Sequence, residues 1–173
     1  MKIDKKAQTH FPFQLIFSLI LIVVFLSVAF FVIRHFLEIQ RCSQIGLFVR
    51  NLQSEIDEIW HTQEANTYIE LDLPTNLEYV CFANLSDEIN LVGLNNEKRR
   101  VVSKIYDDLK IYFKYKHANL FFYPWYKACN MPSHLIRHID TKELGNPYCI
   151  KNNKGKIKFR LFKSINDALV KIK

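Results

Sequence analysis

Glycine and proline are scarce in this chain, whose 173 residues include only four Gly and five Pro. There is no Gly-rich loop that would hold a phosphate, and neither a G-x-S-x-G nor an H-E-x-x-H motif occurs. Cys129 and His134 suggest a nucleophilic pair, but nothing in the pattern orients it. The carboxylates are scattered without an obvious acid/base pair. The sequence therefore predicts no enzymatic activity and no cofactor.

Blocks of like charge are also missing. The chain has 24 Lys and Arg against 17 Asp and Glu, which gives a formal charge of +7 and a pI of about 9.2. The lysines are dispersed, and the abundance of Lys, Asn and Ile is typical of an AT-rich genome. This pattern favours a solvated basic surface and no specific nucleic acid partner, with an anionic partner as the alternative.

One long apolar run stands near the N-terminus. Residues 15–33 carry no charge, and Ser18 and Ser27 are their only polar members. A hydrocarbon core of about 30 Å requires about 20 helical residues, so this run is long enough to span it. A secretory signal has a shorter apolar region and small residues at its cleavage site, whereas Arg34 and His35 follow here. We expect an uncleaved, single-pass transmembrane helix with the lipid bilayer as its partner.

The distribution of basic residues predicts the orientation of this helix. Lys2, Lys5 and Lys6 form a dense group before the span, and the arginines after it have acidic neighbours. The positive-inside rule then favours a cytoplasmic N-terminus and a C-terminal domain outside the cell. The expected domains are a cytoplasmic basic leader (1–14), the transmembrane helix (15–33), its amphipathic continuation (34–64) and an extracytoplasmic α+β domain (65–173).

The pattern after the span changes from uniformly apolar to striped. Apolar residues recur at steps of three and four, as on one face of an α-helix. They are Cys42, Ile45, Phe48, Val49, Leu52, Ile56, Ile59 and Trp60. No Pro interrupts residues 13–63, which predicts one continuous helix of about 50 residues. Its second half would pack on a folded domain or, alternatively, form a coiled-coil homodimer.

Short strand-like segments dominate the rest of the chain. Alternation or apolar clustering predicts strands at residues 67–73, 76–85, 119–126 and 156–163. Residues 96–116 favour a helix, although their end could be a strand. Residues 134–140 resemble one or two helical turns, and residues 164–173 a short helix with Ser164 as its N-cap. The predicted fold class is α+β, with a long N-terminal helix packed on a small mixed sheet.

The expected location of the domain outside the cell suggests that the four cysteines of the chain form disulfides. Cys42, Cys81, Cys129 and Cys149 can form two disulfides, and sequence alone leaves three pairings open. We favour Cys129 with Cys149, which would close one loop, and Cys42 with Cys81, if the strand carrying Cys81 packs on the helical stripe. The alternative is that the four cysteines form no disulfide and remain free, buried thiols.

Two other readings concern the same region and a neighbouring loop. Cys129, His134, His138 and Cys149 provide two thiols and a histidine pair spaced for one helical face, which together would suit a tetrahedral zinc ion. Their spacing matches no common zinc pattern, so we assign no metal site. Asn84 begins an Asn-Leu-Ser tripeptide and is a candidate for N-glycosylation.

A leader-like "KKA" ends at Ala7 and is followed by Gln8, before the apolar helix and its amphipathic continuation. With these features residues 4–60 resemble the archaeal type IV pilin family, whose precursors carry a class III signal peptide. In that family a short basic leader is cut after a small residue, and Gln often opens the mature chain. The resemblance implies cleavage between Ala7 and Gln8. Where the family often has Ser and Glu two and four residues after that Gln, this chain has His10 and Pro12.

The whole chain also resembles small uncharacterised membrane proteins of reduced-genome archaea. They share the runs "CSQIGLF", "LPTNLEYVCFANLS", "NLFFYPWYKACNMPSHLIRHID" and "NPYC". The first resemblance implies a membrane-anchored, pilin-like surface protein with a structural or adhesive role, and the second supports the membrane location and the fold more than any activity. Its N-terminal helix would associate with other copies or with other pilin-like subunits. The alternative is a single-pass protein that never polymerises and carries an extracytoplasmic binding domain, with zinc as one conceivable ligand.

Overall fold

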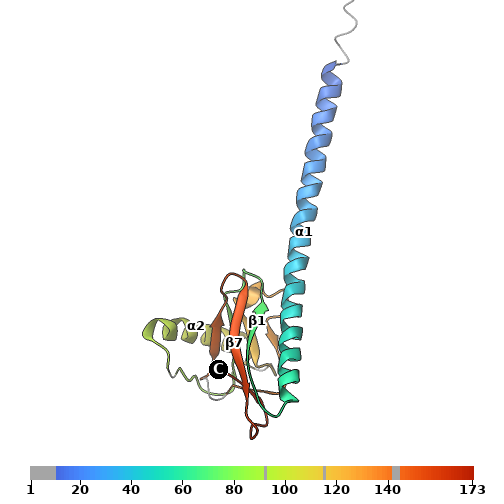
Figure 1. The fold of residues 1–173 in the computed structure, drawn as a ribbon. Helices are drawn as coiled ribbons and strands as arrows, with labels where there is room; N and C mark the ends of the chain where they lie inside the picture. The colour runs from blue at the N-terminus through green and yellow to red at the C-terminus, as the bar shows by residue number, and fades with distance from the viewer. Residues whose placement is uncertain (1–10, 92, 115, 142–144) are drawn as a thin grey trace, which may run out of the picture. The chain divides into compact units, whose positions relative to one another are not determined.

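The computed structural model describes residues 11–173 except residues 92, 115 and 142–144, and it has an α+β fold (Figure 1). Its elements in chain order are α1 (Phe11–Trp60), β1 (Ala65–Asp72), β2 (Tyr79–Phe82), α2 (Asn96–Phe113), β3 (Leu120–Tyr123), the 3-10 helix η2 (Trp125–Lys127), β4 (Ser133–His134), β5 (Ile139–Asp140), β6 (Tyr148–Lys151), β7 (Lys156–Lys163) and β8 (Val170–Ile172). The chain divides into two compact units, residues 1–40 and residues 41–173.

The predicted continuous helix is confirmed, since α1 runs for 50 residues without a break. In the first unit, every side chain from residue 13 to residue 40 is exposed, including all the large apolar ones of the uncharged run. The predicted leader cleavage between Ala7 and Gln8 lies outside the described residues.

The second unit contains two four-stranded sheets, where the sequence predicted one. The first sheet has the order β1-β7-β8-β5 and is mixed, because β5 and β8 run parallel while the other pairs are antiparallel. The second sheet has the order β4-β3-β2-β6 and is antiparallel throughout. The strand predicted at residues 156–163 is confirmed as β7, whereas the strand predicted at 76–85 is limited to the four residues of β2.

The main core lies where α1 and the two sheets meet. The apolar stripe of α1 is buried there, as predicted, with Ile45, Leu52 and Ile56 all at 0% exposure. Phe48 packs edge-on against Phe122 of β3, with ring centroids 5.6 Å apart. The buried members from the sheets are Ile69, Leu71, Val80, Phe82, Leu120, Phe122, Ile157, Phe159, Leu161, Val170 and Ile172. The stripe therefore packs against the domain of its own chain.

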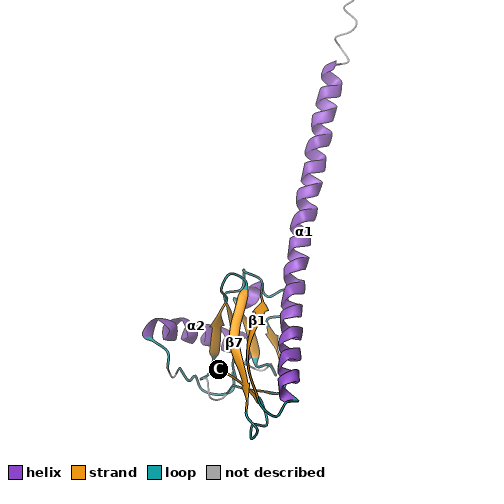
Figure 2. Ribbon diagram, in the orientation of Figure 1, coloured by secondary structure: helices purple, strands orange, loops and turns teal. Residues whose placement is uncertain are grey.

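Helix α2 covers the other face of the second sheet (Figure 2). The side chains of successive strand residues alternate between faces, so Val80 and Phe82 point towards the main core while Cys81 points towards α2. The segment 96–116, ambiguous in sequence, is helical through Phe113, and the Asn95 side chain caps it by accepting a hydrogen bond from the Lys98 amide at 2.9 Å.

The helical turns predicted at residues 134–140 are wrong. Residues 133–134 form β4 against β3, and residues 139–140 form β5 against β8. Between them, the Asn119 side chain accepts a hydrogen bond from the Ile136 amide at 2.7 Å and donates one to the Ile136 carbonyl at 2.8 Å. Those backbone groups are the ones a helix would use, and His138 has a positive φ of 63°, which a right-handed helix does not allow.

The helix predicted at residues 164–173 is also wrong. Ser164 starts a turn in which its own amide donates to Asp167 Oδ2 at 3.1 Å, and the Asp167 amide donates to the Ser164 carbonyl at 2.9 Å. The chain then forms β8 between β7 and β5. Val170 and Ile172 are 0% and 2% exposed, so burying both on one face of a strand outweighs the weak helical propensity of this segment.

Candidate functional site

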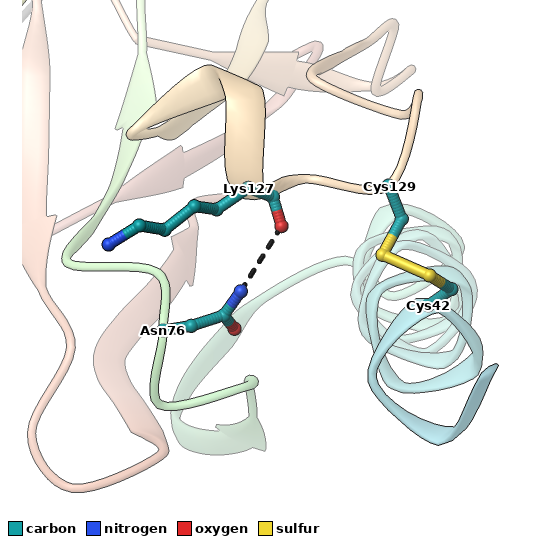
Figure 3. Close-up of a disulfide and its surroundings, with 4 residues drawn as sticks. All are labelled: Cys42, Asn76, Lys127 and Cys129. Carbon is teal, nitrogen blue, oxygen red and sulfur yellow. Dashed lines mark hydrogen bonds between the residues drawn. A yellow bond between two sulfur atoms is a disulfide. The ribbon is translucent and has the colours of Figure 1, made fainter. Parts of the chain in front are cut away.

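The first disulfide joins Cys42 on α1 to Cys129 in the loop after η2 (Figure 3). Cys129 has a positive φ of 52°, and the loop beside it is held by the Asn76 side chain, which donates to the Lys127 carbonyl at 3.2 Å. The two cysteines are 87 residues apart in sequence. Closing so long a loop stabilises the folded chain by about 4.6 kcal/mol in the chain-entropy model, because it restricts the unfolded chain.

The second disulfide joins Cys81 on β2 to Cys149 on β6. The two residues lie directly opposite each other in the register of these antiparallel strands, with their Cα atoms 4.0 Å apart. Cys81 is fully buried beneath α2. This bond therefore fixes β6 to the rest of the second sheet.

The pairing favoured from the sequence, Cys129 with Cys149 and Cys42 with Cys81, is wrong, although all four cysteines do form disulfides. Cys42 lies on the helix that packs on one face of the second sheet, while Cys81 points from the opposite face towards α2. Since successive strand residues alternate between faces, Cys81 is on the wrong side of its strand to reach α1.

The zinc arrangement considered for Cys129, His134, His138 and Cys149 does not form. The two cysteines belong to different disulfides, and the two histidines are not on a helix. Nε2 of His134 is buried without a hydrogen-bond partner among the described residues, and burial lowers the pKa of this imidazole, which favours its neutral form. Within the described part of the chain, no three His, Cys, Asp or Glu side chains are placed to hold a metal ion.

A polar cluster that the sequence did not predict lies at the C-terminal end of α1. Nδ1 of His138 donates a hydrogen bond to Oδ1 of Asp57 at 2.8 Å, and the Gln53 side chain donates to the same oxygen at 2.8 Å. Gln53 also accepts a hydrogen bond from the Arg137 amide at 2.9 Å. The His138 bond is the main reason that the pKa of Asp57 lies below its usual value. The bonds that involve His138 and the Arg137 amide connect residues 81 and 84 positions apart, so no local sequence signal identifies the cluster.

Gln53, Asp57, Trp60 and His138 together support the end of α1, and we call this cluster the brace. The His138 ring stacks on Trp60, so the imidazole is fixed between an indole and a carboxylate. The bonds made by Gln53 and Trp60 go to backbone groups of the loops that flank β5 and β8. The cluster therefore holds the end of α1 against these loops.

The structure also places the candidate glycosylation residue Asn84 and the aromatic segment at residues 119–126. Asn84 is exposed, but its Nδ2 donates to Asp87 at 2.9 Å and its Oδ1 accepts from the Ser86 amide at 3.1 Å. A glycan on this nitrogen would leave it one N–H for the bond to Asp87. In the aromatic segment at residues 119–126, Phe121 and Phe122 are fully buried, whereas Tyr126 is 67% exposed.

Residues 13–33 belong to the only described helix that is long and apolar enough to cross a membrane. A core helix of a soluble domain has a similar composition, but it would be buried by other residues, and here every one of these side chains is exposed. The N-terminal part of α1 is therefore a candidate membrane anchor. Within it, the Ser27 hydroxyl donates to the Val23 carbonyl of the same helix.

Comparison with known proteins gives no identification: no family model, no curated protein and no solved structure matches this chain.

Proposed function

We propose that this chain is a membrane-anchored, pilin-like surface protein with a structural or adhesive role. The observation that supports the proposal is that the two halves of α1 have different surfaces. Its N-terminal part exposes an uncharged apolar surface, and its C-terminal part buries an apolar stripe in a β-rich domain. A helix with these two parts is the plan that the resemblance to archaeal type IV pilins implies.

The disulfides support an outward-facing domain. Disulfides persist in oxidising environments, and both cysteine pairs of this domain are bonded. Combined with the basic residues before the span, this favours a cytoplasmic N-terminus and a domain outside the cell. In this proposal the leader is removed between Ala7 and Gln8, and the exposed apolar helices pack together in the bilayer or in a filament core.

Intact mass spectrometry of the protein from native membranes tests processing and location together. The expected mass is that of a chain starting at Gln8, in which the four cysteines are alkylated only after reduction. A chain that keeps Lys5 and Lys6 and has freely alkylated cysteines would contradict both the leader cleavage and the external domain.

Photo-crosslinking tests assembly separately. A photoreactive phenylalanine analogue at Phe25, which is 69% exposed in the apolar run, should give a ladder of homo-oligomers or adducts with other membrane subunits. The matched control carries the analogue at Leu135, which is 60% exposed on the domain. If neither position gives protein adducts, the protein is a single-pass anchor that does not polymerise.

A further inference from the structure

Strand β6 is one of the two edge strands of the second sheet, and β4 is the other. In the strand order β4-β3-β2-β6, strand β6 has a neighbour only on the side of β2. Three of its residues are half-buried, Lys151 is exposed, and no second described strand pairs with β6. An uncovered strand edge offers unpaired backbone amides and carbonyls to another strand.

The register of β6 identifies which backbone groups face outwards. The Asn152 amide donates to the Glu78 carbonyl at 2.8 Å, and bonding positions recur every second residue, which assigns Ile150 and Tyr148 to the ladder with β2. The intervening residues, Cys149 and Lys151, then direct their N–H and C=O groups away from β2. The structure describes no hydrogen bond to these four backbone groups from any described residue.

A groove runs along this edge. It has a volume of about 450 Å³ and lies between β6 and the N-terminal half of α2. Tyr79 and Cys149 line it from the side of the sheet that faces α2, and Tyr148 and Ile150 of β6, which pack against the main core, also border it. Val101 of α2 adds a partly exposed apolar side chain. Because the groove lies on the α2 side of the edge, it can take the side chains that an added strand directs towards α2.

The charges of the groove favour an acidic occupant. Lys98 and Lys151 line it together with a single carboxylate, Glu97. A second copy of β6 could pair here in antiparallel fashion, but the pairing would bring the Lys98 and Lys151 side chains of both copies to one site. Like charges in close apposition oppose such a pair. An extended segment that carries Asp or Glu satisfies both the backbone groups and the lysines.

We propose that the β6 edge is a peptide-binding site that adds an extended, acidic segment of another protein as a fifth strand of the second sheet. The outward backbone groups of Cys149 and Lys151 bond to the segment, and the groove takes its apolar side chains. The site is independent of the membrane helix and of filament assembly, so it would function equally in a protein that does not polymerise.

Replacement of Lys151 by proline tests the backbone contact directly. Lys151→Pro removes an N–H that points out of the sheet, so the ladder between β6 and β2 keeps its bonds, and proline is tolerated at such edge positions. Lys151→Ala is the matched control, because it removes the same charge and keeps the N–H. The peptide comes from a random decapeptide display library, selected against the full-length protein in nanodiscs and then synthesised with a fluorophore.

The selected peptides should alternate apolar and polar residues and carry an excess of Asp and Glu. Fluorescence polarisation should show that Lys151→Pro weakens their binding about tenfold or more. Lys151→Ala should weaken the binding less, and at high salt its affinity should equal that of the wild type, because only a charge is lost. If no peptide is selected, or if the peptides bind the wild type and Lys151→Pro equally well, the proposal is overturned.

Amide hydrogen exchange on the wild-type protein tests the same backbone contact without any substitution, so the test does not depend on Lys151→Pro being folded. Binding of the selected peptide should slow exchange at Cys149 and Lys151 about tenfold or more and leave Ile150, which is already bonded to β2, unchanged. Unchanged exchange at Cys149 and Lys151 would overturn the proposal. Slowing that depends on protein concentration, without any peptide, would assign the edge to a second copy and overturn it as well.

Discussion

The imidazole of His138 lies flat on the indole of Trp60, with ring centroids 3.8 Å apart and an interplanar angle of 4°. Trp60 is the last residue of α1, and its Nε1 donates to the Ala168 carbonyl at 3.0 Å. One side chain at the helix end thus contacts two loops that are more than 75 residues away in sequence. We infer that this contact determines where α1 ends on the domain.

Substitution of Trp60 measures the strength of this brace. Trp60→Ala should lower the free energy of unfolding by about 2 kcal/mol, because a half-buried indole, its stacking partner and one hydrogen bond are lost. Trp60→Phe keeps an aromatic ring for His138 and should cost about 1 kcal/mol. Denaturant unfolding of the full chain in detergent would measure both, and equal stability of Trp60→Ala and the wild type would contradict the inferred role.

The buried stripe of α1 predicts a larger effect. Phe48→Ala should destabilise the domain by about 3–5 kcal/mol, since this ring is 1% exposed and packs on Phe122. Arg50→Ala, two residues away on the exposed side of the same helix, should change stability by less than about 0.5 kcal/mol. Thermal unfolding of the two variants side by side makes the comparison, and similar melting temperatures would show that the stripe is not buried.

Peptide mapping without reduction tests the disulfide pairing. Trypsin cuts after Lys and Arg, which places the four cysteines in separate peptides, residues 42–50, 51–98, 128–137 and 143–151. The expected linked masses join 42–50 to 128–137 and 51–98 to 143–151. Detection of 128–137 linked to 143–151 would instead restore the pairing favoured by sequence.

The pH dependence of stability should reveal the ion pairs on β1 and β7. Hydrogen bonds from Lys156 and Lys158 lower the pKa of Glu70 from 4.5 to about 2. Between these two values the unfolded chain binds more protons than the folded one. The stabilisation from this group is therefore fully present above pH 4.5 and is lost as the pH falls towards about 2.

Glu70→Gln should accordingly flatten the fall in melting temperature over that pH range. The change should be small, because the pair is exposed to solvent. Glu58→Gln, an exposed carboxylate of α1 with no ion pair described in this structure, is the control and should leave the profile as in the wild type. An unchanged profile in Glu70→Gln would show that these lysines do not lower its pKa.

Local patterns in the sequence determined the long helix, its uncharged run and its buried stripe. A period of 3.6 residues sustained from Cys42 to Trp60 specifies which face is buried without knowledge of the partner. The alternating residues of β7 likewise specify a strand. In both cases a periodic apolar pattern extends over eight residues or more and agrees with the face that the fold buries.

Only the tertiary structure decided the disulfide pairing, the short strands and the brace at the end of α1. Whether Cys81 meets Cys149 or Cys42 depends on the face of β2 that carries it, and a shift of one residue in register would reverse that face. Strands of two or three residues, such as β4, β5 and β8, have too little local preference to be recognised. They form because Asn119, β3 and β7 supply hydrogen-bond partners and burial from distant parts of the chain.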